Sequence, residues 1–314
     1  MKVAIIGAGA IGRSWAISFA RAGHEVALQD EIPEALEAAV AAISEILPHL
    51  AGSGLLSGQS PDDLIRRISV TCDLSSALNN VSYVQENTPE VLENKQRVFA
   101  ELDRLSPADA VIASSTSALL PSTLSANLPG RHRCLVVHPI NPPYIVPAVE
   151  VVPAPWTSES VVHRAKELMA EIGQSPIVMS VEIAGFIMNR LQGALLQEAF
   201  RLVASGVATA EDIDRSVSEG IGLRWSFIGP FKTISLNAPM GLEDFVSRYQ
   251  KMYETIAAGQ SSIVDWTALV PEIDRSLGKP KSRADREAEA LWRDRRLIAL
   301  AAHKRTADPA TQNG

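Results

Sequence analysis

Three glycines near the start of the chain constrain its fold more than any other feature. The stretch MKVAIIGAGAIGRS contains an apolar run, Lys2 to Ile6, that is typical of a short buried strand, and Gly7, Gly9 and Gly12 follow it at once. The residues after Gly12 have the pattern of a helix that ends near Gly23. Glycines between a strand and a helix allow a tight turn, a close approach of the backbone to a pyrophosphate and close packing of the helix. We therefore predict a dinucleotide-binding turn.

An acidic residue at the end of the next apolar run indicates which dinucleotide is bound. The run EVALQ is followed by Asp30, 18 residues after Gly12, where a carboxylate can accept hydrogen bonds from both ribose hydroxyls of NAD. Asp30 would also repel the 2′-phosphate of NADP, and no Lys or Arg occurs between Glu31 and Ile65. The sequence therefore predicts NAD as the cofactor. Its predicted contacts in this region are Gly7, Gly9, Ala10, Ile11, Gly12 and Asp30.

The remaining pattern divides the chain into two domains. Short β-rich runs, among them ISVTC, VSYVQ, AVIAS and CLVVH, alternate with helical stretches over rather more than half of the chain. This alternation is typical of parallel strands joined by crossover helices. From about Gly185 the strand patterns stop and long helical patterns follow. We predict an α/β protein with a doubly wound (Rossmann), mostly parallel sheet over residues 1–184, followed by an all-α C-terminal domain over residues 185–314.

Composition argues against several classes of function. The net charge of −7 disfavours a broad electrostatic surface for nucleic acid or an anionic membrane. The two cysteines, Cys72 and Cys134, match no metal-binding spacing, so we expect no metal site and a reducing, cytoplasmic location. No apolar run is expected to reach the roughly 18 residues of a membrane helix. We expect a small-molecule substrate, with no nucleic-acid or membrane partner.

A histidine and a glutamate in neighbouring segments are the best candidates for catalysis. His138 ends the apolar run CLVVH, and the prolines after it in HPINPP restrict its backbone. Glu150, twelve residues later, is a single carboxylate in the apolar run PAVEVV, and a buried carboxylate requires a partner such as an imidazole. A histidine at the end of a strand can also be purely structural. A histidine oriented by a carboxylate is the general base that oxidation of an alcohol needs.

Together these motifs resemble the 3-hydroxyacyl-CoA dehydrogenase family. The resemblance is carried by the glycine turn, SSTS at 114–117, HPINPP with its following glutamate, and AGFIMNRL at 184–191. Within the family, HPINPPYIVPAVEVVP and SEGIGLRWSFIGPF are most similar to the branch of lambda-crystallin and L-gulonate 3-dehydrogenase, whose members act on a sugar acid. The resemblance implies an NAD-dependent dehydrogenase that forms a homodimer through its helical domain, with the substrate pocket between the domains.

The resemblance also implies catalytic roles. His138 matches the family's base, and Glu150 matches the carboxylate that orients it. Ser117 matches a residue that hydrogen-bonds the reacting oxygen of the substrate, although a serine here could instead belong to a turn. Asn189 matches an amide that polarises the substrate; it is polar within an apolar helix and needs a partner, and helix capping is the alternative.

Two further residues are candidates for cofactor binding. A family glutamate on the loop after the fourth strand falls on Glu90 in QENTPE. Here the chain departs from the family pattern, because ENTPE replaces a more apolar stretch. Lys95, five residues later, completes the predicted cofactor-binding set.

Charge indicates the class of substrate. Acyl-CoA carries phosphates that recruit Lys or Arg, and the CoA-binding members of the family place such residues on the helical excursion after the second strand. In this chain the corresponding helical segment, Glu31 to Ile65, contains neither Lys nor Arg. A small hydroxy acid needs one cation for its carboxylate, and Arg224 in GLRWSF is the candidate; a surface or interdomain ion pair is the alternative. Ser226 and Asn237 could bind hydroxyl groups.

The predicted activity is NAD-dependent oxidation of the 3-hydroxyl of a small hydroxy acid, with the conversion of L-gulonate to 3-dehydro-L-gulonate preferred. Two alternatives are a short-chain 3-hydroxyacyl-CoA dehydrogenase acting on 3-hydroxybutyryl-CoA and a carnitine 3-dehydrogenase, since Trp225 and Phe227 could contact a trimethylammonium group. A purely structural role is an alternative of another class, because crystallins recruit enzymes of this branch. The presence of all four predicted catalytic residues disfavours it.

Overall fold

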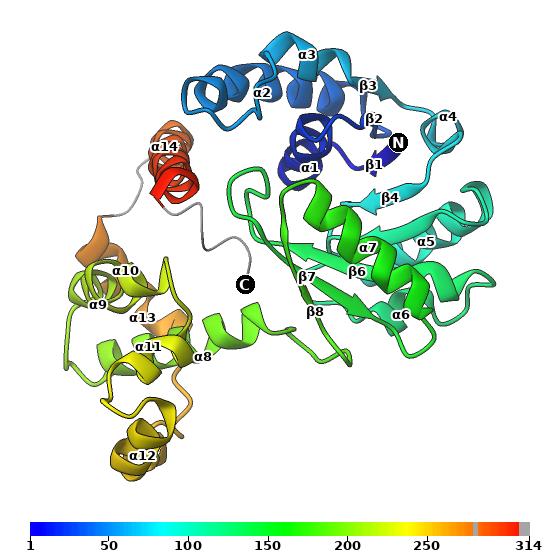
Figure 1. Cartoon of the computed structure of the whole chain (residues 1–314). Helices are drawn as coiled ribbons and strands as arrows, with labels where there is room; N and C mark the ends of the chain where they lie inside the picture. The colour runs from blue at the N-terminus through cyan, green and yellow to red at the C-terminus, as the bar shows by residue number, and fades with distance from the viewer. Residues whose placement is uncertain (279–281, 308–314) are drawn as a thin grey trace. The chain divides into compact units, whose positions relative to one another are not determined.

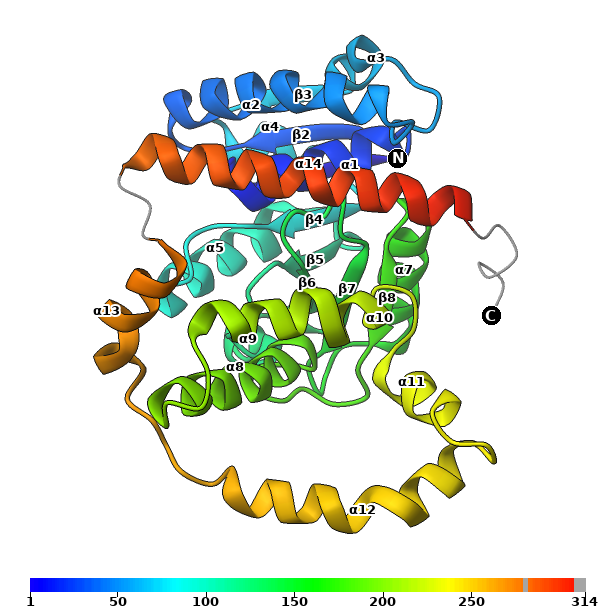
Figure 2. The same cartoon turned by 90° about the vertical axis from the view of Figure 1, so that its left-hand side faces the viewer.

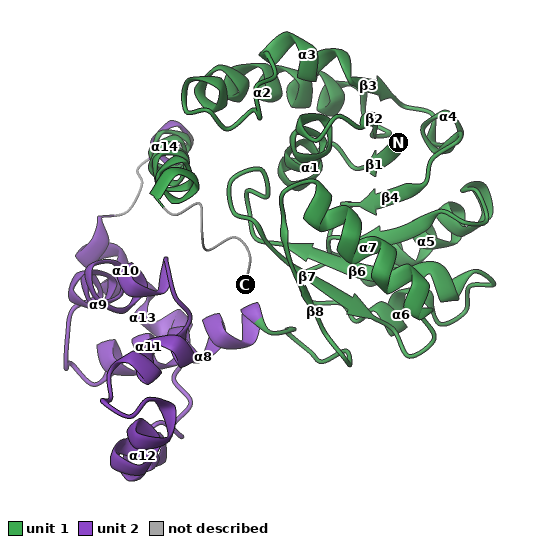
Figure 3. Ribbon diagram, in the orientation of Figure 1, with its two compact units in different colours: residues 1–187, 287–314 green, residues 188–286 purple. Residues whose placement is uncertain are grey.

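The computed structural model describes residues 1–278 and 282–307, and it divides into two compact units. Unit 1 comprises residues 1–187 and 287–314, and unit 2 comprises residues 188–286 (Figure 3). Unit 1 contains a sheet with helices on both faces, whereas the described residues of unit 2 form helices and their connections. The predicted fold class, a Rossmann-type sheet followed by a helical domain, is confirmed.

An eight-stranded sheet forms the centre of unit 1 (Figure 1). Its strand order is β3-β2-β1-β4-β5-β6-β7-β8, and neighbouring strands are parallel except for the antiparallel pair β6 and β7. The order reverses beside β1, and ligands of such sheets bind at the carboxyl ends of the strands next to this point. The strands are β1 (Lys2–Ile6), β2 (Glu25–Gln29), β3 (Ile68–Thr71), β4 (Tyr83–Glu86), β5 (Val111–Ser114), β6 (Cys134–Pro139), β7 (Ala148–Pro153) and β8 (Ser175–Val178).

Helices cover both faces of the sheet because its central strands are apolar on both sides. In β1, Val3 and Ile5 belong to one buried cluster, and Ala4 and Ile6 belong to the other. The first cluster includes residues of α1, α2 and α7, and the second includes residues of α4, α5 and α6. The helices of unit 1 up to residue 187 are α1 (Ala10–Arg21), α2 (Pro33–Gly52), α3 (Pro61–Arg66), α4 (Leu74–Leu78), α5 (Leu92–Leu105), α6 (Pro121–Ser125), the 3₁₀ turn η1 (Arg131–Arg133) and α7 (Glu159–Glu171).

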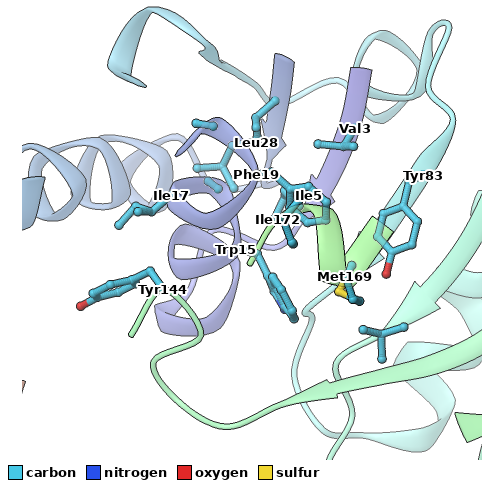
Figure 4. Close-up of a cluster of buried hydrophobic side chains, with 14 of the residues drawn as sticks. Val3, Ile5, Trp15, Ile17, Phe19, Leu28, Tyr83, Tyr144, Met169 and Ile172 are labelled. Carbon is cyan, nitrogen blue, oxygen red and sulfur yellow. The ribbon is translucent and has the colours of Figure 1, made fainter. Parts of the chain in front are cut away.

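Aromatic residues of α1 fix this helix against the sheet (Figure 4). Trp15 and Phe19 are fully buried, and Phe19 packs on Tyr83 of β4 with ring centroids 5.6 Å apart. The indole Nε1 of Trp15 donates a hydrogen bond of 2.9 Å to Ser115 Oγ, just after β5. The helix that follows the glycine turn is therefore held by contacts at the start of β4 and just after the end of β5.

Unit 2 consists of helices with little buried apolar surface in the described structure. Large apolar side chains are exposed along α12, among them Val246, Met252 and Ile256. The elements are α8 (Met188–Ala204), α9 (Ala210–Ser216), the π-helical turn η2 (Val217–Ile221), α10 (Gly222–Trp225), α11 (Pro230–Leu236), α12 (Leu242–Gly259) and α13 (Trp266–Leu277).

The last helix is α14 (Arg283–Ala307; Figure 2). It belongs to unit 1 from residue 287 onward (Figure 3). Ile298 is buried within the first cluster, and Leu297 and Ala301 pack against that cluster. The predicted domains, 1–184 and 185–314, differ from the observed units in this helix, because its apolar stripe completes the core of the first unit. The sequence pattern showed an apolar stripe but not its partner.

Helix α2 is long and apolar enough, by length and composition, to cross a membrane. This differs from the expectation that no apolar run would reach such a length. Its apolar residues Leu36, Ile43 and Leu47 are buried in the first cluster, whereas Glu37 and Glu45 are exposed. The apolar character of α2 is that of a helix that packs against α1 and α3 within the first cluster.

Candidate active site

The first and third glycines of the turn are required by packing within the protein. The backbone of Gly7 has φ +93°, and its N–H donates to Gln29 O at 2.7 Å. A Cβ on Gly12 would lie 1.8 Å from the carbonyl oxygen of Gly7, which is far inside van der Waals contact. Close packing of α1 on the turn therefore leaves no room for a side chain at Gly12.

The middle glycine is required by nothing in the described structure. A Cβ on Gly9 would meet no atom within 4 Å, and no side chain caps the N-terminus of α1 at this residue. The first N–H groups of a helix, here those of Gly9, Ala10 and Ile11, have no partner within the helix and attract anions. An open backbone at the start of α1 fits the pyrophosphate of NAD.

Asp30 is held beside this turn at the end of β2. Its Oδ2 accepts a hydrogen bond of 2.8 Å from the N–H of Ala8, and its Oδ1 accepts one of 3.0 Å from the N–H of Ile32. Each carboxylate oxygen can accept a further hydrogen bond, so both remain able to bind ribose hydroxyls. The arrangement fits NAD, with Asp30 fixed by the backbone on both sides.

Replacing Asp30 with Ala is expected to narrow the preference for NAD over NADP by roughly 10-fold, because a repulsive charge and an acceptor for the ribose hydroxyls are both lost. Dissociation constants of the two cofactors, measured by titration, test this. Asp30→Asn keeps an acceptor but removes the charge, so it should weaken NAD binding less than Asp30→Ala does. A wild-type protein that binds both cofactors equally would contradict the role of Asp30.

His138 and Glu150 form a buried pair. They lie directly opposite each other in the antiparallel pair β6 and β7, and His138 Nδ1 is 2.7 Å from Glu150 Oε2. Glu150 is fully buried, and His138 is 5% exposed. Residues opposite each other in a ladder point to the same face, so the strand register brings the imidazole and the carboxylate together. The predicted pairing of His138 with Glu150 is present in the structure.

The loop after His138 is tied to α1. Arg21 of α1 donates a hydrogen bond of 2.8 Å to the carbonyl oxygen of Tyr144 and one of 3.4 Å to that of Leu55. Burial, with the nearby charge of Arg305 as a second cause, lowers the pKa of Arg21 to about 10, so Arg21 is still charged at neutral pH. The loop after the candidate base is therefore anchored to α1 by Arg21, which also contacts the segment after α2.

Glu90 holds the loop that carries Ser117. Glu90 Oε1 accepts hydrogen bonds from the N–H groups of Ser117 and Ala118, at 3.0 and 3.1 Å, and from the hydroxyl of Thr116. Two residues predicted for separate roles, in cofactor and in substrate binding, are thus in direct contact. They lie at the carboxyl ends of the neighbouring strands β4 and β5.

Lys95 is buried beneath the same loop. Its ammonium group lies 3.0 Å from each carboxylate oxygen of Glu86, 2.9 Å from Thr88 O and 3.6 Å from Glu90 Oε2. The side chain is 1% exposed. Lys95 therefore forms a buried ion pair with Glu86. Its contact with Glu90 links this pair to the loop of Ser117, at the carboxyl ends of β4 and β5. A direct contact of Lys95 with NAD stays a prediction.

The predicted substrate residues of the helical domain lie in unit 2. Asn189 is half-buried in the first turn of α8, and Arg224 is exposed in α10. The hydroxyl of Ser226 donates to Leu223 O at 2.7 Å, and Asn237 follows the last turn of α11. The roles of these four residues toward the substrate stay predictions.

Sequence reasoning missed three contributors to the site. Glu86 was not predicted, although its place at the end of β4 and the spacing to Lys95 could have indicated it. Phe186 packs on the imidazole of His138, and the N–H of Ile187 donates to Glu150. A main-chain donor has no side-chain signature, so Ile187 could not have been found. Among the described residues, no group of three or more His, Cys, Asp or Glu side chains could hold a metal ion.

Two family models cover most of the chain. Residues 2–183 match the model of the 3-hydroxyacyl-CoA dehydrogenase NAD-binding domain, and residues 185–279 match that of the 3-hydroxyacyl-CoA dehydrogenase C-terminal domain. The boundary between the matches falls just before α8. The glycine turn, Asp30 and the His138–Glu150 pair all lie within the first match.

Known proteins resemble the chain over nearly its full length. Lambda-crystallin of Oryctolagus cuniculus is 40% identical over 312 residues, which cover 98% of this chain and 97% of that protein. L-Carnitine dehydrogenase of Streptomyces griseus is 39% identical over 278 residues, which cover 88% of this chain and 79% of that protein. A solved structure of 5-formyl-3-hydroxy-2-methylpyridine 4-carboxylic acid 5-dehydrogenase, described as an NAD⁺-dependent dismutase, has a TM-score of 0.83 and 28% identity, with 95% of this chain and 96% of that chain covered.

Proposed function

Since the chain belongs to the 3-hydroxyacyl-CoA dehydrogenase family and is an NAD-dependent oxidoreductase, we propose that it oxidises the 3-hydroxyl group of a small hydroxy acid, with L-gulonate as the preferred candidate. The observation that carries the proposed chemistry is the buried His138–Glu150 pair at 2.7 Å. The full-length similarity to lambda-crystallin supports the choice of substrate branch. The product would be 3-dehydro-L-gulonate.

His138 would receive the proton of the substrate hydroxyl. Because its Nδ1 is 2.7 Å from Glu150 Oε2, we assign the Nδ1–H to this hydrogen bond, which leaves the lone pair on Nε2. The ionised carboxylate of Glu150 would stabilise the imidazolium that forms. NAD, when bound, accepts the hydride from the carbon that bears the hydroxyl. Ser117 and Asn189 would hydrogen-bond the reacting oxygen.

The surface of α2 supports a substrate without CoA. Residues 31–65 contain no Lys or Arg, and the exposed residues of α2 include Glu34, Glu37 and Glu45. This surface would repel the phosphates of a CoA tail. A free hydroxy acid has no such tail and needs only one cationic partner.

Carnitine is the second candidate, because L-carnitine dehydrogenase is 39% identical over most of the chain. Carnitine is a 3-hydroxy acid with a trimethylammonium group, which aromatic faces bind by cation–π interaction. Trp225 and Phe227 are exposed in unit 2 and could supply such faces. Formation of NADH with L-gulonate, L-carnitine and 3-hydroxybutyryl-CoA, measured side by side, separates the three substrates; L-gulonate should give the highest kcat/KM.

Replacing Arg224 with Met is expected to raise the Michaelis constant for the acid by roughly 10²-fold, since a charge-assisted bidentate pair contributes about 1.5–3 kcal/mol. The affinity for NAD should not change. Arg215→Met is a matched control, because Arg215 is an exposed arginine of the same unit that pairs with Glu211 and Asp212. Unchanged kinetics of Arg224→Met on the free acid, or a preference of the wild type for the CoA ester, would contradict the proposal.

We also propose that the protein is a cytoplasmic homodimer that contacts through unit 2. Along α12, large apolar side chains at helical spacing are exposed: Leu242, Val246, Tyr249, Met252, Tyr253 and Ile256. Burial of this face against a second copy of the chain would remove it from water. Sedimentation should give twice the chain mass of 33.7 kDa. A monomeric mass at micromolar concentration would contradict the dimer.

The proposed cytoplasmic location is supported by the cysteines. Cys72 and Cys134 are free thiols, as expected in a reducing compartment.

A further inference from the structure

The segment that leads from the sheet into α8 lies against the catalytic pair. The N–H of Ile187 donates a hydrogen bond of 2.7 Å to Glu150 Oε1, while Glu150 Oε2 faces His138. The ring of Phe186 packs on the imidazole of His138, with centroids 5.6 Å apart and planes inclined by 51°. Two successive residues of this segment thus contact the two members of the pair.

Glu150 needs donors on both oxygens because it is fully buried. An ionised carboxylate out of water is costly unless hydrogen bonds replace those of the solvent. The imidazole faces one oxygen, and the main chain at Ile187 serves the other. The position of the main chain at this residue therefore contributes to the orientation of the carboxylate, and through it to that of the imidazole.

Phe186 adopts a backbone conformation that its residue type disfavours. Its φ is +51°, directly after Gly185 at +78°, although Phe rarely occupies the left-handed region. Glycine would adopt this conformation without strain, so the backbone alone does not explain a phenylalanine here. The side chain is fully buried in the second cluster, together with Val136 and Val152 of β6 and β7. Burial of the ring beside β6 and β7 thus offsets the free-energy cost of the strained backbone.

We propose that Phe186 is a positioning residue for the reaction: its buried ring fixes the imidazole of His138, and its left-handed backbone directs the N–H of Ile187 to Glu150. The proposal rests on the proposed role of His138 as the base. The proposal assigns a positioning role in the reaction to Phe186 and Ile187, which otherwise only connect β8 with α8.

The test replaces Phe186 with Leu, and Phe99 with Leu as a matched control. Phe99 of α5 is also buried in the second cluster but does not belong to the site, so both variants lose a buried ring from the same core. In Phe186→Leu, kcat should fall by about 10-fold, with the dissociation constant of NAD and the Michaelis constant for the acid little changed. Phe99→Leu should lower the melting temperature but leave kcat near the wild-type value.

A second measurement does not depend on activity. The Nδ1–H proton of His138, hydrogen-bonded to Glu150, should give a downfield NMR signal that is absent from His138→Asn. This signal should shift or broaden in Phe186→Leu and remain unchanged in Phe99→Leu. If Phe186→Leu and Phe99→Leu behave alike in kcat and in this signal, Phe186 is structural only and the proposal is wrong. If His138→Asn retains activity, the proposed role of His138 fails, but the signal still tests whether Phe186 positions the imidazole.

Discussion

Replacing His138 with Ala is expected to lower kcat by about 10²- to 10⁴-fold, the range for removal of a general base, while the dissociation constant of NAD changes little. The effect should be large because both side chains of the His138–Glu150 pair are buried, whereas the carboxylates of the pairs His24–Glu171 and His163–Glu167 are exposed. Single-turnover measurement of NADH formation tests it. Loss of NAD affinity to the same degree would indicate a folding defect instead of loss of the base.

Two further variants, His138→Asn and Glu150→Gln, distinguish loss of the base from loss of the contacts that stabilise and orient it. His138→Ala also leaves the buried carboxylate of Glu150 without its imidazole, which costs stability. Asn at this position can still donate an N–H to Glu150 but cannot accept the hydroxyl proton, so His138→Asn should be more stable than His138→Ala and equally slow. Glu150→Gln should slow turnover because the imidazole is held less firmly and is less basic. If His138→Asn retains wild-type kcat, His138 is not the base.

Replacing Gly12 with Ala is expected to destabilise the protein by about 3 kcal/mol or more and to abolish measurable binding of NAD. A Cβ here would lie 1.8 Å from the carbonyl oxygen of Gly7, and backbone atoms cannot move aside as a flexible side chain can. Either α1 or the turn must shift, and both define the pyrophosphate site. Urea denaturation and NAD titration measure the two effects.

Gly9→Ala is the matched control for this prediction. A Cβ on Gly9 meets no protein atom within 4 Å, and the backbone φ of −66° suits alanine. This variant should be as stable as the wild type or slightly more so, because Ala lowers the entropy of the unfolded chain. It should nevertheless bind NAD at least about 10-fold more weakly, since the methyl group occupies the space that a pyrophosphate needs. Equal stability losses in Gly9→Ala and Gly12→Ala would contradict this division of roles.

The sequence predicted the sheet well where strands are buried. The runs KVAII and EVALQ coincide with β1 and β2, because their residues pack on both faces of the sheet. The short strand β8 was not predicted: its four residues, Ser175–Val178, are largely exposed and include Pro176, so neither alternation nor a continuous apolar run marks them. Assignment of α14 to the first unit could not be predicted either, since an apolar stripe does not reveal which core it packs on.

The sequence predicted the catalytic side chains of the candidate site but not the contacts that hold them in place. His138 and Glu150 could be paired from sequence because a lone carboxylate in an apolar run requires a partner. The contact between Glu90 and the loop of Ser117 depends on the adjacency of β4 and β5, which a linear pattern does not contain. The contribution of Ile187 is a main-chain N–H, for which any residue but proline would serve.

The opposition of His138 and Glu150 in the ladder of β6 and β7 has an evolutionary consequence. The pair is specified by strand register and not by the eight residues, 140–147, that join the two strands. A lineage could therefore lengthen, shorten or rewrite this connection to suit a new substrate without rebuilding the acid–base chemistry. Conversely, an insertion of a single residue in β7 ahead of Glu150 would turn the carboxylate to the opposite face of the sheet. Substrate choice and proton transfer can thus diverge separately in descendants of this chain.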